Sequence, residues 1–326
     1  MTPGRPLPKC AISIDLDSVA CYYRIHGLGT PPPELEHVVL ARGLPRAARL
    51  FASRGIHVTW FVVGRDADGE LDAPDRAARQ ANAQRLRALA EHGDELGNHS
   101  YSHPYELARL AAAEVDAELG GCDRVLRQIT GAPPRGFRAP GYDISPAMLD
   151  GLARRGYRYD SSVFPAPGYY AAKAVVMAGL ALAGRPSGAV MTNPRALAAP
   201  PDPYRPAMQA PWRRGQAPIV ELPIAVTPWL RVPAIGTSLL LAPGALRRRV
   251  VRAMTGRAFF NFELHGIDFI DADLDGIPGE LVARQPDLRI AGAIKQARLG
   301  ALLDQLAGYW QFATLAEVAA DVQRTQ

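Results

Sequence analysis

The sequence predicts an α/β fold in which parallel strands alternate with helices. Short segments rich in β-branched and aromatic residues, such as HVTWFVVG (57–64), alternate with segments whose apolar residues recur at helical spacing. Several helix-like segments also end at a glycine, as at Gly55 and Gly93, which is a common signal for a helix C-terminus. This rhythm is typical of βαβ units and of a parallel sheet.

The first half of the chain contains most of the expected elements. AISIDLD (11–17) is an apolar strand that ends in acids, and ELGNHS (95–100) is a short strand that runs into a polar loop. Further strands are expected at 57–64, 136–140 and 157–163, and helices at 44–54, 78–92, 105–129 and 146–155.

The regular alternation stops near residue 165. Residues 165–217 are rich in Pro, Ala and Gly and have little strand character. Later strands are expected at 219–226 and 258–266, helices at 242–255 and 293–307, and a last strand leading into a helix within 312–322. We therefore predict a single barrel-like domain over residues 9–323, in which residues 165–257 form a long insertion that partly returns to the barrel.

The composition is that of an ordinary globular protein. The 326 residues include 37 Lys+Arg and 32 Asp+Glu, so the net charge is 37 − 32 = +5, and hydrophobic residues make up 48%. These values exclude a disordered chain, a coiled coil and a collagen-like repeat. The basic residues are mostly scattered and no basic tract is interleaved with aromatics, so no nucleic acid is expected as a partner.

Three features indicate where the protein acts. The N-terminal sequence MTPGRPLPKCAISIDLD has no apolar segment that would serve as a secretory signal. The longest mostly apolar stretch, 174–183, is about 10 residues long and too short to span a bilayer. Cys10, Cys21 and Cys122 form no CxxC motif and cannot all pair, which fits a reducing compartment. We therefore expect a cytoplasmic protein.

Candidate catalytic residues lie at the ends of predicted strands. Asp15 and Asp17 end the first strand, His99 and His103 follow a later one, and His265 ends another. Active sites of such folds form from the loops after the carboxyl ends of parallel strands. Two imidazoles and a carboxylate are a suitable ligand set for Zn²⁺ or a related divalent ion. The alternative is that the histidines lie on the surface and the acids only shape a turn.

Several motifs, in order along the chain, resemble those of the NodB-homology polysaccharide deacetylases, carbohydrate esterase family 4. They are IDLD, HSYSH, RAPGY and FNFELHG, and YDSS resembles a further one. The resemblance covers about 9–164 and 258–323 and leaves out the insertion. It implies a distorted (β/α)7 barrel and a metal-dependent amide hydrolase that removes an N-acyl group from an amino sugar.

The resemblance also implies roles for individual residues. Asp17, His99 and His103 would hold one divalent ion, with Zn²⁺ as the expected metal and Co²⁺, Mn²⁺ or Ni²⁺ as alternatives. Asp15 would be the general base that takes a proton from the attacking water. His265 would be the general acid that protonates the leaving amine.

Three further residues complete the implied site. Arg138 would orient Asp15 and keep it ionised. The backbone N–H of Tyr142 would help to hold the oxyanion, and Asp160 would pair with the catalytic histidine. The family's acid pair is adjacent, whereas one residue separates the two acids here, so the choice between Asp15 and Asp17 as the base stays open.

The expected substrate is an N-acetyl or N-formyl amino sugar in a cytoplasmic or lipid-linked precursor. A chain without a secretory signal does not meet a mature cell wall, and an intervening residue between the acids also occurs in branches that include the lipid-linked aminoarabinose deformylases. Two alternatives are hydrolysis of a small or cyclic amide and a non-catalytic carbohydrate-binding relative. Asp15, Arg138 and His265 together favour a catalyst, because binding alone needs none of them as a set.

The insertion is expected to border the catalytic face and to recognise the substrate, because it lies between the strands that carry Asp160 and His265. The apolar stretch 174–183 and the arginine cluster at 247–252 favour an anionic lipid-linked sugar and a peripheral contact with the inner face of the membrane. The alternative is that both segments pack onto the barrel.

Overall fold

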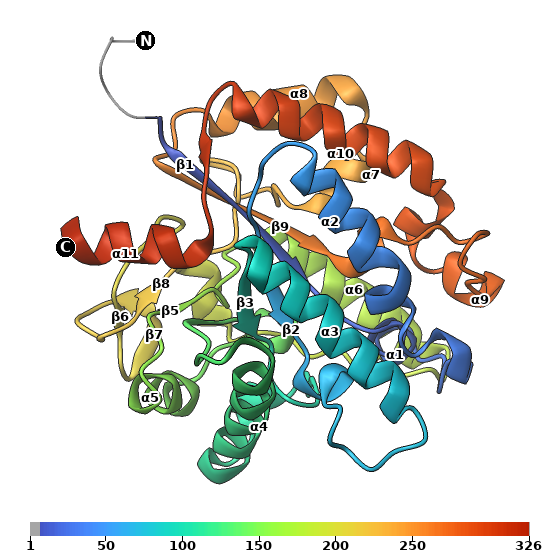
Figure 1. Cartoon of the computed structure of the whole chain (residues 1–326). Coiled ribbons are helices and arrows are strands. Elements are labelled where there is room, and N and C mark those ends of the chain that lie inside the picture. Colours follow the sequence, from blue (N-terminus) through green and yellow to red (C-terminus); the bar gives the residue numbers. More distant parts are fainter. Residues whose placement is uncertain (1–6, 326) are drawn as a thin grey trace.

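The computed structural model describes residues 7–325, which form a curled parallel sheet surrounded by helices (Figure 1). Within these residues the sheet has eight strands, namely β1 (Lys9–Asp15), β2 (Thr59–Val62), β3 (Glu95–Asn98), β4 (Gly136–Phe137), β5 (Tyr159–Asp160), β8 (Val220–Glu221), β9 (Phe259–His265) and β10 (Gln311–Phe312). The strand order is β10-β1-β2-β3-β4-β5-β8, β9 also pairs with β1, and every pairing is parallel. The predicted distorted (β/α) barrel is therefore confirmed.

One backbone hydrogen bond and one side-chain hydrogen bond link the two ends of the curled sheet. The N–H of Ala225, just beyond β8, donates to the carbonyl of Asn261 on β9 at 3.2 Å. The side-chain amide of Asn261 donates to the carbonyl of Leu222 at 3.0 Å. These two contacts bring the segment after β8 against β9 and complete the barrel wall.

The central strand β1 is buried on both faces, as parallel strands usually are. Ile12 and Ile14 belong to the main apolar core, together with side chains from the surrounding helices. Ser13 and Asp15 alternate with them and therefore face the inside of the barrel. The barrel interior is thus polar towards the carboxyl end of β1.

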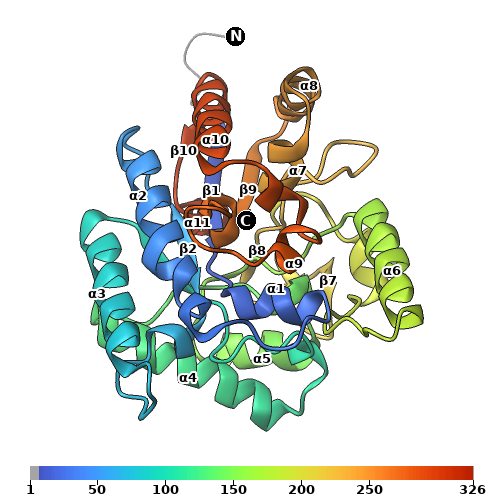
Figure 2. The ribbon, with the colours of Figure 1, turned by 90° about the vertical axis from the view of Figure 1, so that its right-hand side faces the viewer.

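Helices surround the barrel on all sides in the view along its axis (Figure 2). They are α1 (Val19–Ile25), α2 (Leu44–Ala52), α3 (Arg76–His92), α4 (Ala112–Thr130), α5 (Pro146–Arg154), α6 (Pro167–Leu182), α7 (Gly236–Leu241), α8 (Gly244–Met254), α9 (Gly279–Val282), α10 (Gly292–Ala307) and α11 (Leu315–Thr325). Helices α2 to α5, α8 and α10 fall within about two residues of the predicted ranges, except at the start of α4. In the described residues no helix is long and apolar enough to cross a membrane.

The start of α4 corrects the prediction of a helix over 105–129. Residues 107–109 form a short 3-10 turn, and α4 begins at Ala112. The side chain of Glu114 accepts a hydrogen bond from the N–H of Ala111 at 2.9 Å and so caps this later start. The two predicted ligand histidines therefore lie in a loop and not at a helix N-terminus.

The segment 165–257 is more ordered than its composition indicates. Helix α6 covers residues that were expected to be irregular. They form a helix because Pro167 suits a first helical turn and the Ala-rich sequence that follows has high helix propensity. A short antiparallel pair, β6 (Pro206–Ala207) and β7 (Ala210–Arg214), follows. The segment then contributes β8 to the main sheet and ends with α7 and α8.

Candidate active site

The loop after β3 places two histidines over the carboxyl end of the barrel. Its backbone takes positive φ values at Ser100 (65°) and His103 (58°), which are uncommon for residues with a side chain. The side chain of Glu118 on α4 holds this loop by accepting hydrogen bonds from the N–H groups of Tyr101 (2.9 Å) and Ser102 (2.8 Å). The histidines are therefore positioned by a loop that α4 holds in place, and not by their spacing along a helix.

Asp17, His99 and His103 converge as the sequence predicts. The Oδ1 atom of Asp17 lies 3.2 Å from Nε2 of His99 and 3.1 Å from Nε2 of His103. All three side chains are buried, and their ligand atoms lie within 4.8 Å of one another. Burial alone would raise the pKa of Asp17, but the two imidazoles outweigh this effect and hold its pKa well below the usual range.

The hydrogen bonds of the two imidazoles suit them to bind a cation. Nδ1 of His99 lies 2.7 Å from the carbonyl of Arg138 and donates its proton to that carbonyl, so that Nε2 faces Asp17. Nε2 of His103 is buried 3.1 Å from Oδ1 of Asp17 without being aligned for a hydrogen bond, while its Nδ1 lies 3.5 Å from Sγ of Cys21. The two Nε2 atoms and one carboxylate oxygen therefore face one point, and with both nitrogens deprotonated they fit a divalent ion such as Zn²⁺.

Asp15 lies beside this group but has a different partner. The buried guanidinium of Arg138 donates from Nη1 to Oδ1 of Asp15 at 2.6 Å. Oδ2 of Asp15 is 3.9 Å from Nε2 of His99, further than the Asp17 oxygen. The geometry therefore separates the two acids into one that faces both histidines and one that is held by arginine.

Arg138 is fixed from several sides inside the barrel. Its Nε donates to the carbonyl of Ser161 (3.0 Å), and its Nη2 donates to the hydroxyls of Ser13 and Ser161 (2.9 Å each). The guanidinium also stacks on the ring of Phe61, 4.3 Å from its centroid. This network leaves the Asp15 carboxylate little freedom to rotate.

His265, at the end of β9, is paired with an acid that the sequence analysis did not single out. Nδ1 of His265 lies 2.8 Å from Oε1 of the buried Glu263, which is two residues earlier on the same strand. Burial alone would lower the pKa of His265, but Glu263 raises this pKa well above its ordinary value. Period-two spacing on a strand was the available signal, since residues i and i+2 share a face.

Asp160 does not take the role that was expected from the resemblance. It is completely buried at the end of β5, where its Oδ1 accepts a hydrogen bond from the hydroxyl of Ser162 at 2.6 Å. Its other close partner is Glu221 on the adjacent strand β8, which pairs with it in register. The carboxylate that contacts His265 is that of Glu263, so the structure does not pair Asp160 with His265 as expected.

Tyr142 has a side-chain contact that the sequence analysis did not predict. Its backbone N–H donates to the carbonyl of Ala139 at 3.2 Å within a short turn, and its φ is 62°. Its hydroxyl is directed at the His265–Glu263 pair, 3.1 Å from Oε1 of Glu263 and 3.0 Å from Nε2 of His265. In this structure the side chain of Tyr142, and not its N–H, is the group that contacts the other site residues.

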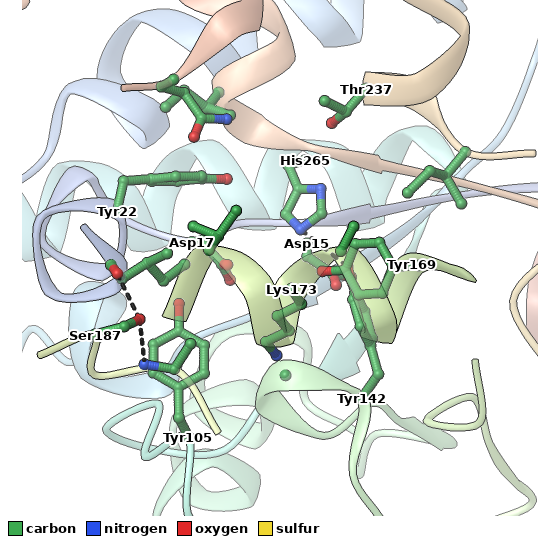
Figure 3. Close-up of a pocket in the computed structure, with 18 of the residues that line it drawn as sticks. Asp15, Asp17, Tyr22, Tyr105, Tyr142, Tyr169, Lys173, Ser187, Thr237 and His265 are labelled. Carbon is green, nitrogen blue, oxygen red and sulfur yellow. Dashed lines mark hydrogen bonds between the residues drawn. The ribbon is translucent and has the colours of Figure 1, made fainter. Parts of the chain in front are cut away.

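Asp15, Asp17, His99, Tyr142 and His265 form one end of a cavity of about 380 Å³. Figure 3 shows the carboxylates of Asp15 and Asp17 close to the ring of His265. The remaining walls are mainly aromatic and aliphatic side chains from several parts of the chain. They include Tyr22, Tyr105, Tyr169, Val176, Met177, Ile235 and Ile267.

The chain is similar to known proteins over part of its length. Residues 39–159 match the family model described as polysaccharide deacetylase. Over 155 residues the chain is 26% identical to the peptidoglycan deacetylase of Helicobacter pylori, an alignment that covers 47% of this chain and 48% of the relative. The chain thus spans about half the length of the curated relatives that it matches.

Two solved structures share the fold over nearly the whole chain. A structure from Mycobacterium smegmatis, reported under the name polysaccharide deacetylase, has a TM-score of 0.59 at 16% identity and covers 100% of this chain and 93% of its own. A similarly named structure from Pseudomonas aeruginosa has a TM-score of 0.57 at 14% identity and covers 99% and 95%. At these identities the likeness establishes the fold.

Proposed function

This chain carries a polysaccharide deacetylase family domain, and on that premise we propose that it hydrolyses the N-acyl amide of an amino sugar. The observation that carries the proposal is the meeting of three groups at one cavity. These are the Asp17–His99–His103 cluster, the Asp15–Arg138 pair and the His265–Glu263 pair. A hydrolase of this type needs a cation site, a base and an acid, and each has a candidate here.

The protein side chains divide the proton transfers between them. Asp15, held by Arg138, accepts the proton of the water whose oxygen adds to the acyl carbon. His265, kept protonated by Glu263, donates a proton to the sugar nitrogen as the carbon–nitrogen bond breaks. The products are a carboxylic acid and a free amine. Tyr142 orients the ring of His265 through its hydroxyl.

Asp17, His99 and His103 are the residues that would hold the cation. A divalent ion bound there supplies Lewis-acid polarisation of the amide carbonyl and lowers the pKa of water. Zn²⁺ is the metal that best suits two imidazoles and one carboxylate, with Co²⁺, Mn²⁺ and Ni²⁺ as alternatives.

The segment 165–257 is proposed to select the substrate. Its residues Tyr169, Met177 and Ile235 line the cavity beside the catalytic groups. We assign the barrel to chemistry and this segment to recognition, because segments over the mouth of a barrel vary while the strands stay fixed. The acyl group is acetyl or formyl, and the sugar is a cytoplasmic or lipid-linked precursor.

The exposed surface of this segment supports a lipid-linked substrate and a peripheral membrane contact. Trp229 and Leu230 are 98% and 82% exposed at the tip of a tight loop, in which the N–H of Thr227 donates to the carbonyl of Val232 at 2.8 Å. On α6, Val175 is 73% exposed. Exposed apolar side chains in such number are unusual for a surface that faces only water.

Basic residues lie on another helix of the same segment. Arg248, Arg249 and Arg252 are exposed on α8. Figure 2 shows α6 and α8 on the same side of the barrel. Tryptophan, aliphatic side chains and arginines on one side suit the interface of an anionic membrane.

A substrate panel tests the proposed reaction. The metal-loaded protein is incubated with N-acetyl and N-formyl amino sugars, free and lipid-linked, and with a cyclic amide such as hydantoin, and release of acetate, formate or amine is measured. Release from the sugars supports the proposal. Turnover of the cyclic amide alone would replace it with the small-amide alternative, and no turnover with full metal loading would favour a binding role.

A further inference from the structure

Helix α6 presents one face to the cavity. Its cavity-lining residues are Tyr169, Ala172, Lys173, Val176 and Met177. Their spacing of i, i+3, i+4, i+7 and i+8 is that of a single helical face. All but one of these side chains are aromatic or aliphatic, and the exception, Lys173, lies near the middle of the face. A lysine at this position of a helix directs its chain into the cavity and not into bulk solvent.

Lys173 is the only lysine or arginine among the residues that line the cavity. Figure 3 shows it extending from α6, with Nζ between Tyr105 and Tyr142 in this view. Its Nζ lies 5.6 Å from the centroid of the Tyr170 ring. In the part of the chain that the structure describes, Lys173 forms no ion pair with an acid.

The surroundings of Lys173 leave its charge without an internal partner. Burial lowers its pKa to about 8, and Asp143 only partly offsets this effect. Asp143 is itself engaged, since its Oδ1 accepts hydrogen bonds from the hydroxyl of Thr192 (2.8 Å) and the N–H of Asn193 (3.1 Å). The ammonium form still predominates at pH 7, and an anion bound beside it would restore the stabilisation that burial removes.

We propose that Lys173 binds an anionic group of the substrate, so that the preferred substrate is an N-acylated amino sugar carrying a phosphate or carboxylate. This inference rests on the proposed function. A neutral N-acyl amino sugar offers this ammonium group only neutral oxygen acceptors, whereas an anionic group would neutralise its charge. The anion has two chemical sources, a sugar phosphate as in a lipid-linked precursor or a sugar carboxylate, and both would place one negative group at Nζ.

The position of Lys173 separates it from the reaction itself. The catalytic carboxylates Asp15 and Asp17 have partners of their own in Arg138 and the ligand histidines. Lys173 therefore acts as a specificity-determining residue, and its removal should change the choice of substrate more than the chemical step.

The test compares Lys173→Met, Lys173→Arg and a control, Arg185→Met, with the wild type. Methionine keeps the length and apolar stem of the side chain and removes the charge. Arg185 is exposed in the same segment and does not line the cavity, so its loss controls for a general change in charge. Turnover is measured with N-acetylglucosamine 1-phosphate, N-acetylmuramic acid and N-acetylglucosamine.

The preference for an anionic substrate is the ratio of its kcat/KM to that of the neutral sugar. In Lys173→Met this ratio should fall by about tenfold or more. The loss should appear mainly in KM, Lys173→Arg should restore most of the ratio, and Arg185→Met should leave the ratio unchanged. The anionic substrate that shows the effect identifies the source of the anion. An unchanged ratio in Lys173→Met, or no recovery with arginine, would overturn the inference.

A binding measurement separates this inference from the proposed function. Calorimetry compares glucosamine 1-phosphate and glucosamine with the wild type and with Lys173→Met. If the wild type turns over none of the sugars, the proposed function fails. Binding of the phosphate that depends on Lys173 would then still support the anion site, and equal binding by both proteins would overturn it.

Discussion

The carboxylate of Glu263 lies 2.8 Å from Nδ1 of His265, and both side chains project from strand β9 into the catalytic end of the barrel. Glu263 is completely buried, and its pKa is also shifted: burial alone would raise it, but His265 and Arg138 hold it below the ordinary value. Glu263 therefore keeps His265 protonated next to the cavity. A histidine in this state is an acid at neutral pH.

Replacing Glu263 with glutamine should lower the pKa of His265. The acid must be protonated to act, so activity falls as pH rises through this pKa. Since Glu263 raises that pKa, Glu263→Gln should move the alkaline limb of the kcat/KM profile to lower pH, with a loss of about tenfold for each pKa unit lost at pH values above both pKa values. The measurement is a pH profile of both proteins. An alkaline limb at the same pH in both would show that Glu263 does not set the protonation of His265.

Removing one imidazole should abolish metal binding without unfolding the barrel. His99→Ala deletes one of three ligands and should lower the metal content of the purified protein from about one ion per chain to near zero. Wild-type melting temperature should rise on adding Zn²⁺, and that of His99→Ala should not, because only a ligand that binds the native state stabilises it.

A second histidine group provides the control for this experiment. His57, His92 and Asp94 also have ligand atoms within 4.8 Å of one another, but His57 and His92 are exposed. His92→Ala should keep both the metal and the thermal shift. Loss of metal in His92→Ala with retention in His99→Ala would place the ion at the surface and contradict the assignment.

Elements with a clear local sequence pattern could be predicted, and elements that depend on distant parts of the chain could not. Helical spacing predicts α2 to α5 because these helices bury one face and expose the other, and mostly apolar runs predict β1 and β2, which are buried on both faces. Strand β8 has only two residues, and its pairing with β5 depends on the whole barrel. Helix α6 was missed because its sequence lacks an amphipathic pattern: only Tyr170 is buried, and the outer face is apolar as well.

The residues of the candidate site likewise fall into those that could be predicted and those that could not. Motifs predict which residues meet, and Asp17, His99 and His103 do meet. The family motifs do not include Glu263 as the partner of His265, although the two residues share a face of β9 and period-two spacing could have indicated their contact. Lys173 carried no such signal, because a single lysine beside an apolar stretch is ordinary until the helix face that it shares is known.

Replacing Asp15 with asparagine should separate the base from the ligand. Asp15→Asn keeps the shape of the side chain and should retain metal while turnover falls by about 10² to 10⁴. Asp17→Asn should instead weaken metal binding, because the carboxylate oxygen that faces both imidazoles is lost. Metal content and kcat of the two variants are measured together, with circular dichroism as the check on folding. Loss of metal in Asp15→Asn would exchange the two roles.

Reversing the charge of the α8 arginines should weaken binding to anionic membranes. The variant carries glutamate at positions 247, 248, 249 and 252, and binding is measured by sedimentation with vesicles that contain phosphatidylserine. Each arginine near an anionic surface contributes about 1 kcal/mol, so the affinity should fall at least tenfold, and wild-type binding should weaken with added salt. A matched control reverses Arg42, Arg49, Arg76 and Arg127, which lie on or beside α2, α3 and α4.

Trp229 provides a direct signal for the same contact. The other three tryptophans, Trp60, Trp212 and Trp310, are buried, so an emission change on adding vesicles reports mainly on Trp229. We expect a blue shift with anionic vesicles and a smaller one in the α8 charge-reversal variant, because a tryptophan that enters the membrane interface leaves water. Hydrolysis of a small soluble substrate should be the same in all these proteins, since α8 contributes no residue to the cavity. Absence of vesicle binding by the wild type would remove the membrane contact from the proposal and leave the deacylase site as it stands.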